Sequence, residues 1–469
     1  MPHMAHMQGP FDIAADLDTP VSTFLKLGPL KPRFLLESVE GGLQLARYSF
    51  LGFGGAAELR LDGRGLRVNG RLQPLPAGRD ALLDALRAAL AATPRLAPEV
   101  PGLPFTGGLV GVAGYDIVRR FERLERPPPG AACPEVPEAA YLATDSMLVF
   151  DHLTRRIALL HAGGEAERAR VRSEVLRLLR GPLPPALPNQ RHAPAVQSFS
   201  GEEYRAAVER ARHYISLGDV YQLVLSVRFA GEHTLSPFET YRAMRLINPS
   251  PYMFFLDLGD VQVAGSSPEA LVRLRGGHAA LRPIAGTRPR GADQAADLAL
   301  EAGLRADEKE NAEHVMLVDL ARNDLGRVAA AGSVHVDPYK AIERYSHVMH
   351  IVSGVQGRLA PGRDAFDLFA AAFPAGTLVG APKVRAMELI DELEPVRRGL
   401  YAGTVGYFGN NGDMDQAITI RTLVFRDGTY SYQAGAGIVA DSVPESEYQE
   451  VLAKSAILRR ALAMAEGGL

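Results

Sequence analysis

The fold class is decided by residues 251–286, which read PYMFFLDLGDVQVAGSSPEALVRLRGGHAALRPIAG. Four strand-like runs, 251–258, 261–265, 271–274 and 279–284, follow one another without a helical segment between them. Strands joined by short turns pair antiparallel, because a parallel crossover needs a long connection that is usually a helix. The segment therefore predicts antiparallel sheets rather than a doubly wound parallel sheet.

Other parts of the chain combine strands with helices. Strand-like runs occur at 141–150, 402–409 and 416–425, where apolar and β-branched residues predominate. Apolar residues recur at helical spacing in 82–90 and 171–179. Because helices accompany successive strands, we predict the α+β class.

A proline-rich stretch divides the chain. Residues 181–195 read GPLPPALPNQRHAPA and have the periodicity of neither a helix nor a strand. Proline fixes φ and removes a backbone donor, so we expect an extended linker or a surface crossing here. The predicted division is an N-terminal region, 1–180, and a longer C-terminal region, 196–469.

The bulk composition is that of an ordinary globular protein. Of 469 residues, 47% are hydrophobic and 22% are charged, and the net charge of −3 argues against a nucleic-acid binder. Cys133 is the single cysteine, so an intrachain disulfide is impossible. The N-terminus lacks a signal-peptide core, and no apolar run approaches the ~20 residues that span a bilayer. We therefore expect a cytoplasmic protein.

Two segments each place a pair of glutamates on one helical face. In 306–326, Glu313 shares an apolar face with Leu317 and Leu320, and Glu310 lies one turn earlier. Carboxylates on a buried face are unfavourable unless they are paired or bind a cation.

The second such segment is 444–462. Glu447 shares a face with Val451 and Lys454, and Glu450 lies beside it. Two helices that each aim an E-x-x-E pair inward would suit Mg²⁺, which prefers oxygen ligands. The alternative is two solvated acidic faces, with Glu450 and Lys454 forming an ordinary i,i+4 pair. Spacing alone leaves both interpretations open.

Two further features are suited to anions. Residues 433–442 read QAGAGIVADS, where Gly435 and Gly437 would let backbone N–H groups approach an anion, and a tight turn is the alternative. Period-two alternation in QAITIRT, residues 416–422, sets Thr419 and Arg421 opposite Ile418 and Ile420. Arg421 would then hold a carboxylate through two hydrogen bonds, or face solvent from an edge strand.

The histidines of YSHVMHIVSG, residues 345–354, are ambiguous. His347 and His350 are three residues apart on a strand-like or short helical run, where structural roles predominate. The chain has no H-E-x-x-H motif and no cysteine ligand set, so zinc is not expected.

Taken in order, these segments resemble the chorismate-binding enzymes, and specifically component I of anthranilate synthase. The resemblance covers essentially all of 200–465, and FLLESVE (34–40) and RYSFLG (47–52) also match. It implies an α+β fold in which large antiparallel or mixed sheets pack together with helices outside. The motifs that carry it are LRPIAGTRPRG (281–291), DEKENAEHVMLVDLARNDLGRV (307–328), YSHVMHIVSG, FPAGTLVGAPKVRAMELI (373–390), GLYAGTVGYFG (399–409), QAITIRT (416–422) and QAGAGIVADSVPESEYQEVLAKS (433–455).

The resemblance also implies the metal and its ligands. Glu313 and Glu450 match Mg²⁺ ligands, with Glu310 and Glu447 in direct or water-mediated support. The metal would hold the ring carboxylate of chorismate, act as a Lewis acid and fix the substrate's orientation.

Catalytic and substrate-binding roles follow in the same way. Glu269, in GSSPEAL, matches the general acid that protonates the departing C4 hydroxyl, a poor leaving group. His350 and Thr377 match further catalytic positions, and Arg421 would take the enolpyruvyl carboxylate. Substrate-binding positions match at Gly286, Thr287, Tyr401, Arg421, Gly435, Ala436, Gly437 and Lys454.

Members of the family differ in the nucleophile that they add to chorismate. Isochorismate and salicylate synthases use a lysine to activate water, and Gln222 stands at that position here. Aminodeoxychorismate synthases commonly carry a lysine in a PIKGT motif, which reads Pro283 to Thr287 with Ala285 in the lysine's place. Both positions indicate an anthranilate synthase, although an aminodeoxychorismate synthase that lacks the lysine remains an alternative.

The source of ammonia is expected to be a second chain. Glutaminases of the usual partner type need a nucleophilic cysteine, but Cys133 lies in AACPEVPE without a nucleophile-elbow pattern. No amidotransferase domain is expected within the 469 residues. We therefore predict a hetero-oligomer with a separate glutamine amidotransferase, component II.

A regulatory site is implied by FLLES and NPSPYMFF. Glu37, Ser38, Pro251, Tyr252 and Met253 match the family's feedback site for L-tryptophan. Because Glu37 and Ser38 are polar within an apolar run, a ligand would satisfy them; the alternative is that these residues are core strands and turns. A catalytically silent tryptophan-binding subunit is the alternative of another class, against which the complete set of acidic residues argues.

Overall fold

The computed structural model describes residues 9–38, 47–124, 136–185, 187–344 and 348–469. The predicted α+β class is confirmed, because antiparallel sheets and helices make up this part of the chain. The helices are α1 (Pro20–Lys26), α2 (Arg79–Ala91), α3 (Glu165–Leu179), α4 (Gly201–Ser216), α5 (Pro237–Ile247), α6 (Gln294–Ala306), α7 (Glu308–Gly326), α8 (Ala365–Ala372), α9 (Lys383–Leu393) and α10 (Pro444–Gly467), with short 3₁₀ turns η1 (Gly28–Leu30), η2 (Tyr115–Arg120) and η3 (Gly376–Leu378).

The larger sheet of the described chain, here the 12-stranded sheet, is antiparallel throughout. Its strand β12 is long and pairs on one side with β26 over ten residues and on the other with β11 and β22. In spatial order it contains β1 (Ile13–Ala14), β10 (Arg156–His161), β9 (Ser146–Asp151), β3 (Tyr48–Phe53), β2 (Pro32–Glu37), β13 (Tyr252–Asp257), β14 (Gln262–Ser267), β25 (Thr422–Arg426), β26 (Thr429–Ile438), β12 (Gln222–Glu232) and β11 (Val196–Gln197), and β22 (Gly380–Ala381) pairs with β12 off this path.

Two further sheets complete the described part of the chain. The 11-stranded sheet contains β18 (His335–Val336), β21 (Val355–Arg358), β16 (His278–Leu281), β15 (Ala270–Arg275), β24 (Met414–Ile418), β23 (Thr404–Gly409), β7 (Gly108–Ala113), β8 (Ala139–Ala143), β4 (Ala57–Asp62), β5 (Gly65–Val68) and β6 (Arg71–Gln73). The three-stranded sheet contains β17 (Ile284–Pro289), β20 (Val348–Val352) and β19 (Ala341–Arg344).

The two large sheets pack face to face over an apolar layer. Phe34 and Phe254 of the 12-stranded sheet and Val110 and Val405 of the 11-stranded sheet belong to one buried cluster. Phe105 fills its centre, with its ring 4.5 Å from that of Tyr407 and 5.6 Å from that of Phe50. Interdigitated inner faces of this kind are the core of a β-sandwich.

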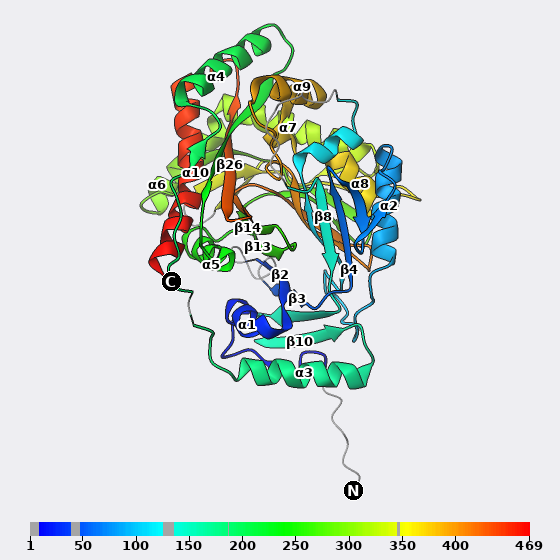
Figure 1. Ribbon diagram of the computed structural model, residues 1–469. Helices are drawn as coiled ribbons and strands as arrows, with labels where there is room; N and C mark the ends of the chain where they lie inside the picture. The colour runs from blue at the N-terminus through cyan, green and yellow to red at the C-terminus, as the bar shows by residue number, and fades with distance from the viewer. Residues whose placement is uncertain (1–8, 39–46, 125–135, 186, 345–347) are drawn as a thin grey trace.

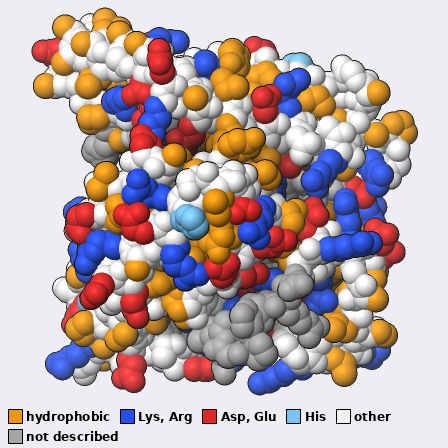
Figure 2. All heavy atoms as spheres, turned by 90° about the horizontal axis from the view of Figure 1, so that it is seen from above, with side chains coloured by type: hydrophobic (Ala, Val, Ile, Leu, Met, Phe, Trp, Pro, Cys, Tyr) orange, Lys and Arg blue, Asp and Glu red, His pale blue; other side chains and the backbone are white. Residues whose placement is uncertain are grey.

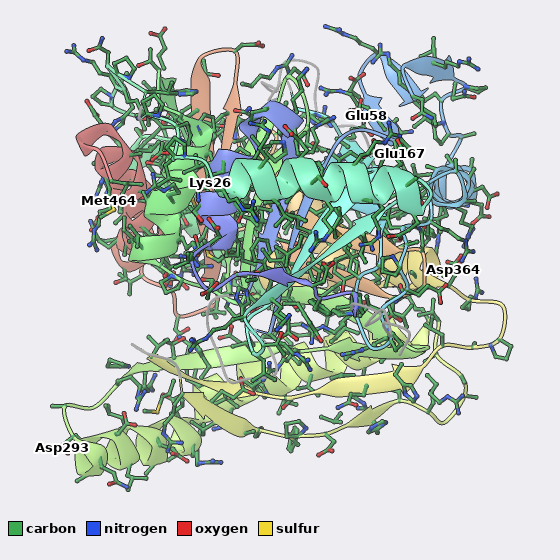
Figure 3. The ribbon with its side chains drawn as sticks, turned by 90° about the horizontal axis from the view of Figure 1, so that it is seen from below. Lys26, Glu58, Glu167, Asp293, Asp364 and Met464 are labelled. Atoms are coloured by element: carbon green, nitrogen blue, oxygen red, sulfur yellow. The ribbon has the colours of Figure 1, made fainter. Side chains whose placement is uncertain are left out.

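Helices cover the outer faces of the sandwich. On one side α4, α5 and α10 pack against one another and against β12, β14 and β26, and on the other α2 and α8 lie over the 11-stranded sheet (Figure 1). Figure 3 shows α6, which begins after Asp293, with the strands of 284–352 as a layer on one side of the sandwich. Basic and acidic side chains are mixed over the face seen in Figure 2.

The predicted division of the chain does not separate the sheets. Strands from before and after the proline-rich stretch pair in both of them, as β2 does with β13 and β7 with β23. Within the described residues of 181–195 there is no helix or strand. The helices predicted around 82–90 and 171–179 are confirmed as α2 and α3.

Two predicted single strands are wrong, for one physical reason. Residues 141–150 divide into β8 and β9, and 416–425 divide into β24 and β25, with one strand of each pair in each large sheet. The chain thus passes from one sheet to the other within a few residues. Neither run contains a glycine or a proline, so no helix- or strand-breaking residue marks the passage in the sequence.

The passage from β24 to β25 lies beside another passage between the sheets, from β14 to β15, and we call these two together the paired crossing. The chain leaves β14 at Ser267 and enters β15 at Ala270, while β24 ends at Ile418 and β25 begins at Thr422. Ile418 N donates to Glu269 O at 3.0 Å, and Ser267 Oγ donates to Ile418 O at 2.7 Å. The crossing strands therefore remain hydrogen-bonded to each other while they change sheets.

We predict that Ser267→Ala lowers the free energy of unfolding by about 1–2 kcal/mol, because Ile418 O would lose a partner in a buried position. Urea unfolding of the purified protein measures this difference. The matched control is Ser173→Ala, which removes an exposed hydroxyl bonded within its own helix. Equal unfolding midpoints for the two variants would contradict the role assigned to Ser267.

Candidate active site

Glu269 lies between β14 and β15, in one of the two segments of the paired crossing. Its Oε1 accepts a hydrogen bond of 3.0 Å from Thr377 Oγ1, on the η3 turn. Burial raises the pKa of the Glu269 carboxyl to about 7, although the Thr377 hydroxyl and the positive charges of Arg421 and Lys454 act in the opposite direction. Near neutral pH, Glu269 can therefore both hold a proton and release it, which is what a general acid requires.

Arg421 lies between β24 and β25, in the other segment of the crossing. Its backbone is left-handed, with φ of +48°, and its carbonyl accepts a hydrogen bond of 3.1 Å from Ser266 N. Both sequence interpretations placed Arg421 in a continuous strand, and this is wrong, because the strand ends at Ile418. Burial lowers the pKa of the Arg421 guanidinium, and the nearby charges of Glu269 and Glu450 oppose that shift. A bound carboxylate would offset the same desolvation.

Tyr401 and Gly435 lie next to this arginine. Tyr401 is 8% exposed, and burial raises the pKa of its hydroxyl to about 12, so it stays a neutral hydrogen-bond donor. A Cβ on Gly435 would lie 2.7 Å from the Tyr401 hydroxyl. Glycine is required where the backbone of β26 approaches this ring.

The predicted glycine loop at 433–442 is corrected by the structure. Gly435, Ala436 and Gly437 lie within β26, where each pairs with a residue of β12. A Cβ on Gly437 would lie 2.7 Å from Gln222 Nε2. The glycines therefore make room along a strand, and they do not form the anion-binding turn expected from the sequence.

Gly286, Thr287 and His350 meet on the three-stranded sheet. Gly286 lies at a register shift in β17 with φ of +69°, which brings the strand against α7, where a Cβ would lie 3.3 Å from Glu310 Oε2. His350 Nδ1 is 3.1 Å from Gly286 O and 3.1 Å from Thr287 Oγ1. Since a carbonyl only accepts, Nδ1 carries the proton and Nε2 is the basic nitrogen. Burial lowers the pKa of His350, which favours this neutral form.

The four predicted glutamates line an accessible face instead of a closed interior. Glu310, Glu313 and Glu447 are half-buried and Glu450 is exposed. Burial raises the pKa of the Glu313 carboxyl, and the charges of Glu310 and Glu450 add to the shift. The pKa of Glu447 is raised by burial and by the charge of Glu450. The two helices thus bring carboxylates close enough to repel one another.

Two of these glutamates have cationic partners. Arg288 Nη1 lies 3.2 Å from Glu310 Oε1, and Lys454 Nζ lies 2.6 Å from Glu450 Oε1. The i,i+4 pair considered in the sequence therefore exists, but Lys454 Nζ also donates to Gly435 O at 3.0 Å, which directs it to β26.

We tested whether this set of residues fits a divalent cation. Within the described residues, no three His, Cys, Asp or Glu side chains form a ready-made metal cluster. The carboxylate oxygens nevertheless form the donor set that Mg²⁺ prefers, and their mutual repulsion is what a cation relieves. Mg²⁺ usually keeps several water ligands and needs only one or two carboxylates, so the donor set fits it.

A separate cavity of about 250 Å³ lies between the two large sheets. The five residues predicted for inhibitor binding, Glu37, Ser38, Pro251, Tyr252 and Met253, all line it. The expectation that Glu37 lacks a partner is wrong, because its carboxylate accepts a hydrogen bond from the Tyr241 hydroxyl and lies 3.2 Å from Arg245 Nε.

The cavity also reaches the paired crossing, since Pro268, Ala270 and Ala417 line it. Two of these residues flank Glu269 in the chain. A molecule bound in this part of the cavity would therefore lie beside the residues on both sides of Glu269.

Two arginines near the candidate site were not predicted from the sequence, and two residues discussed there lie outside the described part of the chain. Arg288, which pairs with Glu310 and with Asp307 at 2.7 Å, was missed, although it directly follows Gly286 and Thr287 in their motif. The buried arginine Arg398 was also missed. Cys133 and His347 lie outside the described residues. Among the described residues, no helix has the length and apolar character needed to cross a membrane.

Comparison with known proteins identifies the family and the fold. The family described as chorismate binding enzyme matches residues 31–460. The chain is 48% identical over 460 residues to anthranilate synthase component 1 of Thermus thermophilus, covering 97% of each chain. Its fold is similar to that of anthranilate synthase component I from Streptococcus pneumoniae TIGR4, with a TM-score of 0.79, 38% identity and coverage of 88% and 92%.

The chain therefore belongs to the chorismate-binding enzyme family. The relatives with which it shares the highest identities above are component 1 chains of anthranilate synthase. A menaquinone-specific isochorismate synthase from Escherichia coli shares the fold, with a TM-score of 0.69, 19% identity and coverage of 94% and 91%.

We predict that Thr377→Val raises the pKa of Glu269 above about 7, because the lost hydrogen bond favours the ionised carboxyl. The pH titration of the protonated-carboxyl band in the infrared spectrum, assigned with Glu269→Gln, measures this value without substrate. Thr93→Val is the matched control, since it removes a buried hydroxyl that is bonded to Asn410 Oδ1 at 2.8 Å. A titration unchanged in Thr377→Val would contradict the assignment.

Proposed function

We propose that this chain converts chorismate and ammonia to anthranilate and pyruvate with Mg²⁺, the first step of tryptophan biosynthesis, in the cytoplasm. The near full-length similarity to component 1 chains of anthranilate synthase supports the reaction. The observation that carries the choice within the family is Gln222: this neutral amide donates to Glu313 Oε1 at 3.4 Å, in the position where a water-activating lysine would stand.

The binding of chorismate follows from its two carboxylates. Arg421 is a desolvated cation at the crossing, and it would take the enolpyruvyl carboxylate, with the Tyr401 hydroxyl beside it. Glu313 and Glu450, with Glu310 and Glu447 in support, would hold Mg²⁺. When bound, the metal supplies a Lewis acid for the ring carboxylate.

Two steps then complete the reaction. Ammonia adds at C2 while the C4 hydroxyl leaves as water, with the proton supplied by Glu269. Loss of the C2 proton then expels the enolpyruvyl group as pyruvate and makes the ring aromatic. His350, neutral and protonated on Nδ1, is suited to accept a proton on Nε2.

The site also favours ammonia over other nucleophiles. Gln222 cannot remove a proton from water, and Ala285 cannot form a covalent adduct. Ala285 is 8% exposed in β17, next to Gly286, so a small side chain leaves room at this end of the sheet. If the enolpyruvyl group were retained after addition at C2, the product would be 2-amino-2-deoxyisochorismate, whereas aminodeoxychorismate carries its amino group at C4.

We predict that the purified chain forms fluorescent anthranilate from chorismate, Mg²⁺ and an ammonium salt. EDTA should abolish the signal, and Glu313→Ala should lower kcat/KM at least about a hundredfold, because a metal ligand is lost. Glu58→Ala, at an exposed carboxylate of the 11-stranded sheet, is the control. Chorismate consumption without anthranilate would move the assignment to aminodeoxychorismate or isochorismate synthesis, and no consumption would support a silent subunit.

The same assay tests the proposed partner. We expect activity with ammonium but none with glutamine until a glutamine amidotransferase, component II, is added, because the chain has no nucleophilic cysteine in a suitable motif. Glutaminase activity of the isolated chain would refute a separate ammonia source.

We also propose that the cavity between the sheets binds L-tryptophan as a feedback inhibitor. Apolar walls from Phe50, Met253 and Val405, with the carboxylate of Glu37 at one end, suit an aromatic amino acid. Contact with Pro268 and Ala270 would give such a ligand access to the backbone of Glu269.

We predict that Glu37→Gln raises the tryptophan concentration for half inhibition at least about tenfold, because a charged partner of the ligand ammonium is lost. KM for chorismate should stay unchanged. Glu58→Gln is the matched control. Wild-type activity that does not respond to millimolar tryptophan would remove the regulatory proposal.

A further inference from the structure

A fully buried ion pair lies behind the candidate active site. Glu394 and Arg398 have side chains that are 2% and 1% exposed, and Arg398 Nη2 donates to Glu394 Oε1 at 2.7 Å. A second hydrogen bond, from Arg398 Nε to Glu394 Oε2, measures 3.0 Å. The pair is bidentate, with both side chains fixed in one relative orientation.

The two side chains also make hydrogen bonds to two neighbouring elements, η3 and β12. Arg398 Nη1 donates to Leu378 O at 2.7 Å, and Arg398 Nη2 donates to Val224 O at 2.8 Å. Glu394 Oε1 accepts from Ser226 N at 2.9 Å and from Ser226 Oγ at 2.7 Å. The pair thus joins the η3 turn to β12, with every one of these bonds buried.

Both connections lead to the site. Leu378 is the last residue of the η3 turn, and Thr377 of the same turn donates a hydrogen bond to Glu269. Two hydrogen bonds and the Thr377–Leu378 backbone therefore connect Arg398 to the general acid. Ser226 is the β12 partner of Gly435. The Arg398 guanidinium carbon also lies 5.6 Å from the centre of the Tyr401 ring, and Tyr401 N donates to Arg398 O at 3.2 Å.

We propose that the Glu394–Arg398 pair is a positioning unit for the reaction: it fixes the η3 turn so that the Thr377 hydroxyl meets Glu269, and it fixes Tyr401 against β26. Neither residue reaches the substrate in this account. The inference rests on the proposed function, since it assigns a task to groups that the proposed reaction uses.

Stability alone is a poor explanation for this arrangement. Desolvating two charges is unfavourable, and well-packed apolar residues of similar volume often stabilise a fold as well or better. A bidentate pair offers instead a fixed geometry, with four further hydrogen bonds to η3 and β12. Misplacing a catalytic group by about 1 Å can lower a rate about a hundredfold, so such fixing has catalytic value.

The test uses Arg398→Lys, which keeps the charge but cannot make the two-pronged bond and also reach Leu378 O and Val224 O. Glu394→Gln is the second variant, in case lysine at 398 prevents folding. The control is Arg119→Lys: Arg119 pairs at 2.6 Å with Asp391 of helix α9, which ends just before Glu394, and Asp391 takes no part in the hydrogen bonds that join Arg398 to η3 and β12. Circular dichroism and urea unfolding establish that each variant is folded.

The readout is the pKa of Glu269, from the infrared titration and from the alkaline limb of kcat/KM. The charged groups that act on Glu269 are Arg421 and Lys454, and Arg282 and Asp324 line the small cavity beside it; none of them is altered. We expect Arg398→Lys to raise this pKa by about half a unit or more and to move the alkaline limb to higher pH, because the Thr377 bond is weakened. We also expect kcat to fall about tenfold or more.

A double-mutant cycle makes the test specific. In a Thr377→Val background, Arg398→Lys should cause little further shift, since the bond through which it acts is already absent. An unchanged Glu269 titration in Arg398→Lys, additive shifts in the cycle, or an equal shift in Arg119→Lys would overturn the inference. The infrared titration needs no turnover, so this outcome is distinguishable from a failure of the proposed reaction, which would appear as wild-type protein that forms no anthranilate.

Discussion

The paired crossing of two strands between the large sheets is the constraint on which the rest of the structure depends. β14–β15 and β24–β25 change sheets side by side, and their backbones stay hydrogen-bonded while they do so. In the crossing, neither of the two segments is paired with a neighbouring strand on both sides, so side chains of these segments can project between the ends of the two sheets. Glu269 lies on one of these segments and Arg421 on the other.

The electrostatics of the site follow from that placement. Burial at the crossing favours the neutral form of Glu269 and disfavours the charge of Arg421, and each group partly compensates the other. On the acidic face of α7 and α10, burial and the charges of neighbouring carboxylates raise the pKa of Glu313 and Glu447. A dianionic substrate with a divalent cation would complement both, because it brings negative charge to the arginine and positive charge to the glutamates.

The sequence predicted much of the fold from local patterns. Antiparallel pairing followed from four successive strands, and the helices that carry Glu313 and Glu450 were expected close to where α7 and α10 begin. The crossing itself was not predictable in this way. The run 416–425 contains neither glycine nor proline, and only tertiary structure shows that its two halves belong to different sheets.

The individual site residues show the same contrast between what the sequence predicts and what only the folded chain reveals. Glu269, Arg421 and the four glutamates were identified through ordered motifs, which record chemistry that local propensity does not encode. Gly435 and Gly437 were assigned to a turn, whereas their role is to let β26 approach Tyr401 and Gln222. Arg398 was missed because a buried charge with no contact to the substrate has no signature in spacing; its partners at Leu378, Val224 and Ser226 become neighbours only in the folded chain.

The most direct test of the central claim is calorimetric titration of chorismate, with Mg²⁺, into Glu269→Gln and Arg421→Ala, followed by product analysis of the same samples. If one segment of the crossing presents a proton donor and the other a carboxylate-binding cation, Glu269→Gln should bind chorismate with close to wild-type affinity and form no anthranilate. Arg421→Ala should lose most of the binding. Turnover by Glu269→Gln, or wild-type affinity in Arg421→Ala, would contradict the account.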